Sequence, residues 1–219
     1  MAAFFWDAEY GIYRMNNRSV IYIDGFNLYY GALRGSADKW LDLAEYFRLL
    51  RTDDDIQRIR YFTARVNRPD QNAYLEAIQT NPLVVTEFGL FKQKKMRCHV
   101  KSCLHTGSRE YAAMEEKGTD VNIALRMLDD AYQGICDRII LVSGDSDLVP
   151  TVRLIKQRFP KIRITVYVPA RDKIRGAARE LRNAADKHLT LPLGLLAKAQ
   201  FPVSITKADG NIIMKPPSW

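Results

Sequence analysis

Two short apolar runs, rich in β-branched residues, each end abruptly at acidic residues. Residues 19–23 (SVIYI) lead into Asp24-Gly25, and residues 138–142 (RIILV) lead into Ser143-Gly144-Asp145-Ser146-Asp147. Short apolar runs that stop at turn residues predict buried β-strands. Because segments with helical spacing separate these runs from other strand-like segments, they indicate an α/β fold.

Strand and helix patterns alternate along most of the chain. Further strands are expected at residues 58–64, 83–91 and 162–168, with a short edge strand at 189–191. Helices are expected at residues 27–33, 40–50, 70–79, 148–159 and 174–185, and from residue 120 onward. The alternation predicts a parallel, doubly wound central sheet flanked by helices. Residues 203–214 predict a small C-terminal β-hairpin, whereas the basic and polar residues 92–116 predict a loop or flap.

The length and charge of the chain indicate its organisation and its partners. Its 219 residues suit one α/β domain, which we place at residues 18–192. An aromatic extension (1–17) precedes it, and an extension with the β-hairpin (193–219) follows it. The net charge of +8 favours a polyanionic partner, since lysine and arginine displace counterions from phosphates.

The sequence argues against secretion and membrane insertion. The N-terminus lacks a basic segment followed by an apolar one, and no apolar run approaches the roughly 18 residues of a membrane span. Cys98, Cys103 and Cys136 are too few, and odd in number, for a disulfide framework. We therefore expect a cytoplasmic protein with no membrane partner.

Four aspartates are expected at one edge of the predicted sheet. Asp24, Asp145 and Asp147 follow predicted strands, and Asp120 begins a predicted helix. In open α/β sheets, functional groups collect beyond the carboxyl ends of the strands. Clustered carboxylates repel each other unless a cation compensates them, and oxygen ligands suit Mg²⁺ or Mn²⁺. Aspartate is also a common helix N-cap, and Asp120 or Asp147 taken singly fits that role equally well.

Three segments around these aspartates resemble a known family. They are residues 20–27 (VIYIDGFN), 116–121 (EKGTDV) and 141–148 (LVSGDSDL). In this order they look like the three signature segments of NYN domains, in the PIN-like nuclease superfamily and close to its LabA-like branch. The resemblance covers roughly residues 18–192. It implies a PIN-like fold, cleavage that depends on Mg²⁺ or Mn²⁺, and RNA as the usual substrate.

The resemblance also assigns roles to individual residues. Asp24, Asp120, Asp145 and Asp147 would be the catalytic, metal-binding set, and Asn27 and Ser143 would orient the substrate or the carboxylates.

HAD phosphatases are a rival class with similar acidic motifs. They carry an acid two residues after the first aspartate and another four residues after the later one. Here Phe26 and Val149 occupy those positions, so that class is excluded.

Basic residues and cysteines add two further hypotheses. Lys117 precedes Asp120 by three residues, and Arg171, Lys173 and Arg175 follow a predicted strand, so all four are candidates for phosphate contacts. Basic residues of the flap are equally compatible with contacts along a phosphate backbone and with a solvated loop.

The flap also contains two cysteines and two histidines close together, Cys98, His99, Cys103 and His105, but their spacing differs from the usual zinc-finger pairs. We therefore favour cysteines that act as small hydrophobic residues over a zinc site.

The function expected from these features is hydrolysis of single-stranded RNA by a metal-activated water, as an endoribonuclease. A non-catalytic RNA-binding or regulatory module with the same acidic pocket is the main alternative, and a DNA nuclease is the third. Either extension, the aromatic N-terminus or the C-terminal hairpin, is equally suited to form a homodimer or to cover the sheet edge of its own domain.

Overall fold

A seven-stranded sheet forms the centre of the protein. The computed structural model describes residues 4–7, 12–15, 17–66, 68–100, 102–171 and 179–219. The strands of the central sheet are β3 (Asn17–Asp24), β4 (Asp54–Ala64), β5 (Val84–Arg97), β6 (Glu110–Lys117), β7 (Arg138–Val142), β8 (Arg163–Val168) and β9 (Lys187–Thr190). Their order is β6-β5-β4-β3-β7-β8-β9, and all neighbours are parallel except β5 and β6. The predicted α/β fold, PIN-like with a mainly parallel sheet, is confirmed.

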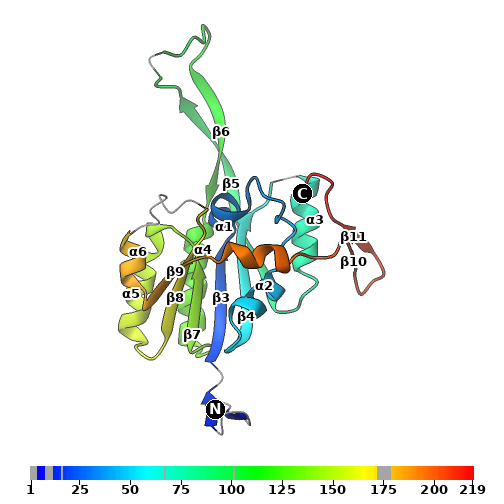
Figure 1. Cartoon of the computed structure of the whole chain (residues 1–219). Coiled ribbons are helices and arrows are strands. Elements are labelled where there is room, and N and C mark those ends of the chain that lie inside the picture. Colours follow the sequence, from blue (N-terminus) through cyan, green and yellow to red (C-terminus); the bar gives the residue numbers. More distant parts are fainter. Residues whose placement is uncertain (1–3, 8–11, 16, 67, 101, 172–178) are drawn as a thin grey trace.

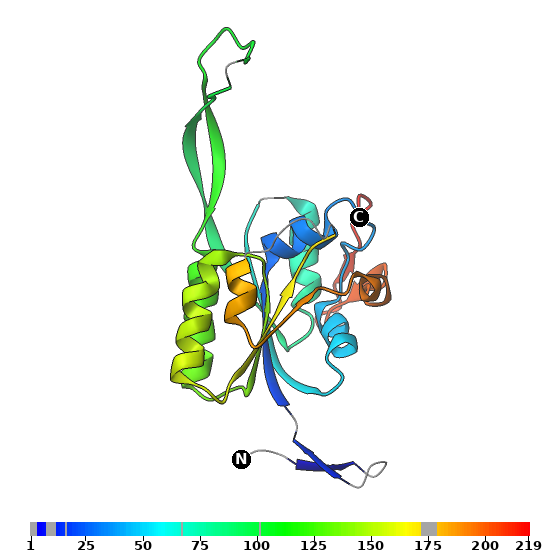
Figure 2. The same ribbon diagram turned by 60° about the vertical axis from the view of Figure 1, so that its left-hand side comes forward.

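Helices cover both faces of this sheet (Figure 2). One face carries α1 (Gly25–Leu28), the π-helix η1 (Tyr29–Leu33), α2 (Leu43–Leu50), α3 (Pro69–Ile78) and the 3₁₀ helix η3 (Leu193–Lys198); the other carries α4 (Thr119–Tyr132), α5 (Val149–Arg158) and α6 (Arg179–Ala184). Side chains of a strand alternate between its two faces. Ile21 and Ile23 of β3 accordingly pack with the first set, and Val20 and Tyr22 pack with the second. Both faces of β3 are therefore core.

The order in which strands are added to the sheet reverses at β3. From β3 it runs outward through β4 and β5, and it then returns to place β7 on the opposite side of β3. In open α/β sheets this topological switch point opens a crevice at the carboxyl ends of the two central strands. These ends lie at the top in Figure 1. Asp24 is the last residue of β3, and Ser143 follows β7 directly.

The prediction of a loop or flap at residues 92–116 was wrong for residues 92–97 and 110–116, which form strands, and the described residues between them form the loop at the tip. β5 continues to Arg97 and pairs with β6 in a long antiparallel hairpin, which rises from the edge where the parallel strands end (Figure 1). Most side chains on this ribbon are exposed, so neither face imposes the apolar alternation by which strands are recognised in a sequence. Cross-strand hydrogen bonds between backbones, which leave no trace in the residue pattern, hold it together.

The helices begin close to their predicted positions, with local differences. The predicted helix at residues 40–50 begins only at Leu43, because the Asp42 carboxylate accepts hydrogen bonds from the amides of Ala44 (3.0 Å) and Glu45 (3.1 Å). Trp40 lies before it, fully buried. Of the helix predicted at residues 174–185, the structure shows α6, and residues 174–178 lie outside the described residues.

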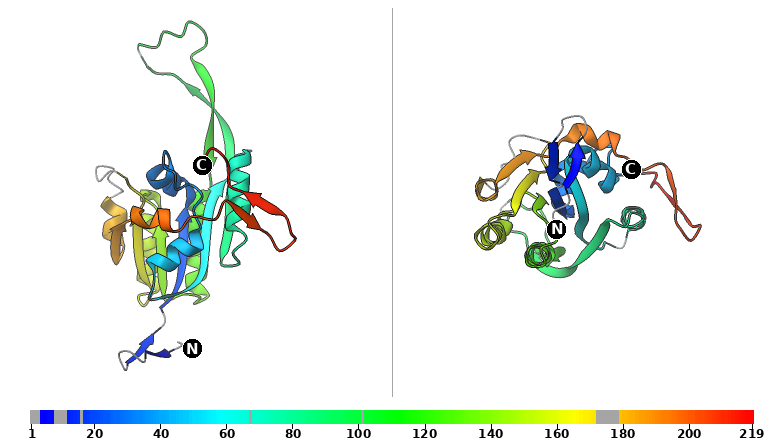
Figure 3. Two further views of the ribbon diagram at one scale, coloured as in Figure 1. Left: turned by 45° about the vertical axis from the view of Figure 1, so that its right-hand side comes forward. Right: turned by 90° about the horizontal axis from the view of Figure 1, so that it is seen from below.

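Two small hairpins lie outside the central sheet. β10 (Ser204–Thr206) and β11 (Ile212–Met214) form the predicted C-terminal hairpin, which projects sideways beside α3 (Figure 3). β1 (Phe4–Asp7) and β2 (Ile12–Met15) pair beyond the start of β3, at the edge opposite the carboxyl ends (Figure 1). In the described part of the chain, no helix has the length and apolar character to cross a bilayer.

Candidate active site

Asp24 is held rigidly at the end of β3. Only 3% of the residue is exposed. One carboxylate oxygen, Oδ1, accepts a hydrogen bond from the backbone amide of Asn27 (3.0 Å); the other, Oδ2, accepts from the Asn27 side-chain amide and from the Ser143 hydroxyl (3.1 Å). Burial raises the pKa of Asp24, these hydrogen bonds oppose the rise, and repulsion from Asp145 adds to it.

The loop after β7 joins the same network. The amide of Gly144 donates to the side-chain oxygen of Asn27 (3.1 Å), and the amide of Asp145 donates to the Ser143 hydroxyl (3.1 Å). Asp145 in turn accepts a hydrogen bond from the amide of Asp147 (2.9 Å), so it caps the short 3₁₀ helix η2 (Ser146–Leu148). Asn27 and Ser143 therefore fix the ends of β3 and β7 against each other.

Asp120 approaches the cluster from the first turn of α4. It is half-buried, and its pKa is raised to about 6, first by burial and then by repulsion from Asp145, Asp24, Glu116 and Asp147. The structure thus brings the four predicted aspartates into one electrostatic cluster. The helix-capping alternative does not describe Asp120 or Asp147. Asp24 and Asp145 cap helices, whereas Gly118 precedes α4.

Sequence reasoning missed Glu116 as a fifth member. Its carboxylate accepts hydrogen bonds from the backbone amide (2.9 Å) and the hydroxyl of Thr119 at the start of α4. A Cβ at Gly89 would lie 2.7 Å from this carboxylate, so glycine is required where β5 passes the helix start. The spacing Glu116-x-x-Thr119 is the sequence signal for this contact, and the prediction of a flap at residues 92–116 conceals it.

The chemistry of the cluster fits a hard divalent cation. Its candidate donors are carboxylate oxygens, and a cation would relieve the repulsion that raises the pKa of Asp120. Within the described ranges, no three Cys, His, Asp or Glu side chains are already arranged to hold a metal ion. Mg²⁺ commonly binds through one or two carboxylates and keeps several waters, so a preformed set of three is not required.

The basic candidates lie in different environments. Lys117 pairs with Glu115 (3.1 Å), its neighbour on the face of β6 opposite Glu116. Arg171 donates a hydrogen bond to the carbonyl of Ala32 (2.8 Å) and so holds η1 against the end of β8. Neither interaction reaches the acidic cluster. Lys173 and Arg175 lie outside the described residues.

The predicted cysteine and histidine group belongs to the tip of the long hairpin. Cys98 and Cys103 are half-buried there, and His99 and His105 are exposed. The backbone amide of Cys98 donates a hydrogen bond to the carbonyl of Arg109 (2.8 Å), and this bond lies just beyond the last paired residues of β5 and β6. The described tip residues show no arrangement of three such side chains around a metal position.

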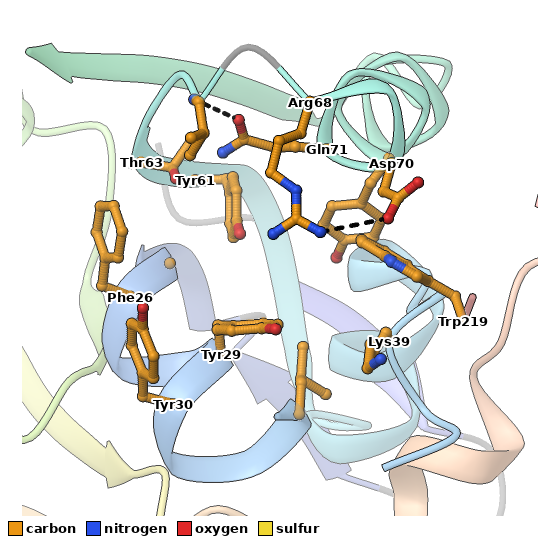
Figure 4. A pocket seen from close by; sticks show the side chains of 14 residues that line it. Phe26, Tyr29, Tyr30, Lys39, Tyr61, Thr63, Arg68, Asp70, Gln71 and Trp219 are labelled. Carbon is orange, nitrogen blue, oxygen red and sulfur yellow. Dashed lines mark hydrogen bonds and ion pairs between the residues drawn. The ribbon is translucent and has the colours of Figure 1, made fainter. Parts of the chain in front are cut away.

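An aromatic pocket, shown in Figure 4, begins at the residues that follow Asp24. Gly25 and Phe26, which follow Asp24 directly, form part of its wall, and its volume is about 170 Å³. Six aromatic side chains line it: Phe26, Tyr29, Tyr30, Tyr61, Tyr74 and Trp219. The sequence does not predict this pocket, because its rings come from four separate segments of the chain.

Comparisons with known proteins agree with this architecture. The family described as NYN domain matches residues 18–193. A protein of Pseudomonas putida named 6-hydroxy-3-succinoylpyridine 3-monooxygenase HspA is 31% identical, over 92% of this chain and 75% of that protein. A crystal structure of a protein of unknown function from Vibrio parahaemolyticus superimposes with a TM-score of 0.54 at 21% identity, covering 81% of this chain and 94% of that one. This last likeness concerns the fold alone.

Proposed function

The chain belongs to the NYN domain family, and from this premise we propose that it is a metal-dependent nuclease that cleaves single-stranded RNA internally. The observation that carries the proposal is the cluster of Asp24, Asp120, Asp145 and Asp147 at the switch point between β3 and β7, with the pKa of Asp120 raised to about 6 by burial and repulsion. Such a cluster is costly without a cation. The net charge of +8 supports a polyanionic substrate.

The carboxylates of the cluster differ in how firmly hydrogen bonds hold them. Asp24, held by three hydrogen bonds, provides a fixed carboxylate, and Asn27 and Ser143 position it. Asp120, which is only partly buried, and the exposed Asp147 are the adjustable groups, and Asp145 keeps one carboxylate oxygen for an ion while the other caps η2. A bound Mg²⁺ or Mn²⁺ would supply an activated water and stabilise the departing oxygen.

The test is cleavage of a labelled single-stranded RNA by the purified protein. We expect cleavage with Mn²⁺ or Mg²⁺, none with EDTA, and at least a hundredfold loss in Asp120→Asn, since carboxylates that hold the ion act only in combination. Asp129→Asn, an exposed aspartate on the same helix, is the matched control. Equal cleavage by Asp120→Asn and wild type would refute the assignment.

Substrate form separates the remaining alternatives. A circular RNA is cut only by an endonuclease, and a DNA strand of the same sequence tests the preference for RNA. Binding of RNA without turnover in any divalent ion would favour the non-catalytic RNA-binding module.

One observation favours a second candidate function. The Pseudomonas putida relative carries the name of a monooxygenase acting on a pyridine, and an aromatic pocket lies beside Asp24 here. A monooxygenase transfers one atom of dioxygen to the ring and releases the other as water, with two electrons from an external reductant such as a nicotinamide. Oxygen uptake with 6-hydroxy-3-succinoylpyridine and NADH tests this directly. Uptake that depends on substrate would favour it over the nuclease.

A further inference from the structure

The aromatic pocket has room for one ring. A cavity of about 150 Å³ with apolar walls is large enough for a benzene molecule, and this pocket measures about 170 Å³. Pockets for whole drug-sized ligands are larger, at about 300–1,000 Å³. Aromatic walls bind planar rings by stacking, with little dependence on their identity. The volume therefore indicates a single six-membered ring.

A hydroxyl at the inner wall gives this pocket polarity. Tyr61 is 8% exposed and points into the pocket (Figure 4), and among the described residues its hydroxyl has no hydrogen-bond partner. That hydroxyl lies 2.8 Å from the position that a Cβ at Gly25 would take, directly after Asp24. A hydroxyl that faces the pocket with its hydrogen-bonding capacity free favours a ligand that has hydrogen-bonding atoms on its ring.

Charges at the pocket favour an anionic group on the ligand. Lys39 and Arg68 line it together with one carboxylate, Asp70. Asp70 already accepts a hydrogen bond from the Ser218 hydroxyl (3.0 Å) and lies 3.7 Å from the Arg68 guanidinium. Because two cations face one carboxylate, the balance is positive, as a phosphate requires.

We propose that this pocket binds the pyrimidine base of a nucleotide next to the bond that the Asp24 cluster acts on, with the nucleotide phosphate near Lys39 and Arg68. The proposal rests on the proposed nuclease function, which places a phosphodiester at Asp24. The pocket would then hold the RNA through one base, which the carboxylates do not bind. A free heteroaromatic carboxylate shares the ring and the charge, and it forms a separate arm of the test.

Calorimetric titration in EDTA tests base binding without any need for cleavage. The probes are uridine monophosphate, adenosine monophosphate and nicotinate, and tryptophan fluorescence, to which Trp219 in the pocket wall contributes, provides a second signal. We expect uridine monophosphate to bind, and adenosine monophosphate to bind more weakly because its ring system is larger. Binding by wild type in EDTA while RNA stays uncut with metal would separate this proposal from failure of the nuclease.

Two variants report on the two recognition elements. Arg68→Gln, at a side chain 69% exposed, should weaken uridine monophosphate binding about threefold to fivefold, and Tyr61→Phe about threefold to tenfold. Arg153→Gln, an exposed arginine on α5 across the sheet, should leave it unchanged. The proposal is overturned if uridine monophosphate does not bind, if only nicotinate binds, if adenosine monophosphate binds more tightly, or if both pocket variants bind like wild type.

Discussion

The Ser143 hydroxyl donates a hydrogen bond of 3.1 Å to the Asp24 carboxylate and joins the ends of the two central strands. The same hydroxyl oxygen accepts a hydrogen bond from the amide of Asp145 (3.1 Å). One fully buried side chain therefore connects two candidate metal ligands, one at the end of β3 and one in the loop after β7. Positioning groups of this kind tune the affinity of a metal site without contacting the ion.

Ser143→Ala should therefore weaken metal binding while the fold remains. Removal of the hydroxyl takes one hydrogen bond from Asp24 and leaves the Asp145 amide without its acceptor. We expect an affinity for Mn²⁺ lower by about 10-fold to 100-fold, measured by calorimetric titration. Ser146→Ala, at an exposed serine of the same loop, is the control. Unchanged Mn²⁺ affinity in Ser143→Ala would contradict the positioning role.

The alternation of strands and helices was enough to place Asp24 and Asp145, because each follows an apolar run whose end determines the sheet edge. Glu116 and the aromatic pocket depend on contacts between distant segments, which periodicity does not encode. The π-helix at Tyr29–Leu33 also differs from the ordinary helix that its residues predict. It lies where Gly31 passes so close to Pro169 that a Cβ at Gly31 would lie 2.1 Å from the Pro169 carbonyl oxygen.

Asp120→Asn should stabilise the metal-free protein at neutral pH. The pKa of Asp120 is about 6 in the folded state, above its ordinary value of 3.8, so the folded state binds the proton more tightly than the unfolded state. The free energy of unfolding contributed by this group therefore falls as pH rises from about 4 to 6, and stays low above that range. Asparagine is neutral throughout and removes this penalty.

Urea unfolding in EDTA measures the effect. At pH 8 we expect Asp120→Asn to be more stable by about 1 to 2 kcal/mol, a value reduced from the full shift because the side chain is half exposed to solvent screening. The difference should vanish well below pH 3.8, where Asp120 is neutral in both the folded and the unfolded state. Asp129→Asn should change stability by less than about 0.5 kcal/mol at either pH. Lower stability of Asp120→Asn at pH 8 would contradict the repulsion in the cluster.

A buried ion pair holds α4, the helix that carries Asp120, against the sheet. The Arg60 guanidinium of β4 donates two hydrogen bonds of 2.7 Å to Asp130 of α4, and the Tyr22 hydroxyl donates a third to the same carboxylate (2.6 Å). Asp130 is 1% exposed. Arg60 also pairs with Glu87 (2.7 Å), so Asp130→Asn leaves the arginine with one of its two counter-charges, and we expect a loss of about 2 to 3 kcal/mol in the free energy of unfolding.

Denaturant titration distinguishes this pair from surface pairs. Glu45→Gln, which breaks the exposed pair with Arg48, should cost less than about 1 kcal/mol. The double variant Arg60→Met, Asp130→Leu should recover part of the loss, since it removes both charges of the buried pair and Glu87 keeps its ion pair with Arg126 (2.7 Å). A loss in Asp130→Asn as small as that in Glu45→Gln would show that the pair contributes little.

The long hairpin presents different cations on its two faces. Phe91 of β5 packs edge-to-face on Phe26 of α1, with ring centroids 5.9 Å apart, and pairs across the ribbon with Glu116. Since side chains alternate along a strand, Lys95 and Arg97 share the face of Phe91, which adjoins the acidic cluster. Lys92 and Lys94 occupy the other face, where Lys94 pairs with Glu115 (3.3 Å). If a bound RNA runs along the hairpin, we expect it to contact the face that carries Phe91, Lys95 and Arg97.

The salt dependence of RNA binding shows which face of the hairpin the RNA contacts. Each phosphate neutralised on a single strand contributes about 0.7 to the slope of log K against log salt. The double variant Lys95→Gln, Arg97→Gln should therefore lower that slope by about 1.4, measured by fluorescence anisotropy with a labelled single-stranded RNA in EDTA. The matched variant Lys92→Gln, Lys94→Gln removes the same charge from the opposite face and should lower it by much less. Equal slopes for both variants would mean that net charge, and not one face of the hairpin, determines binding.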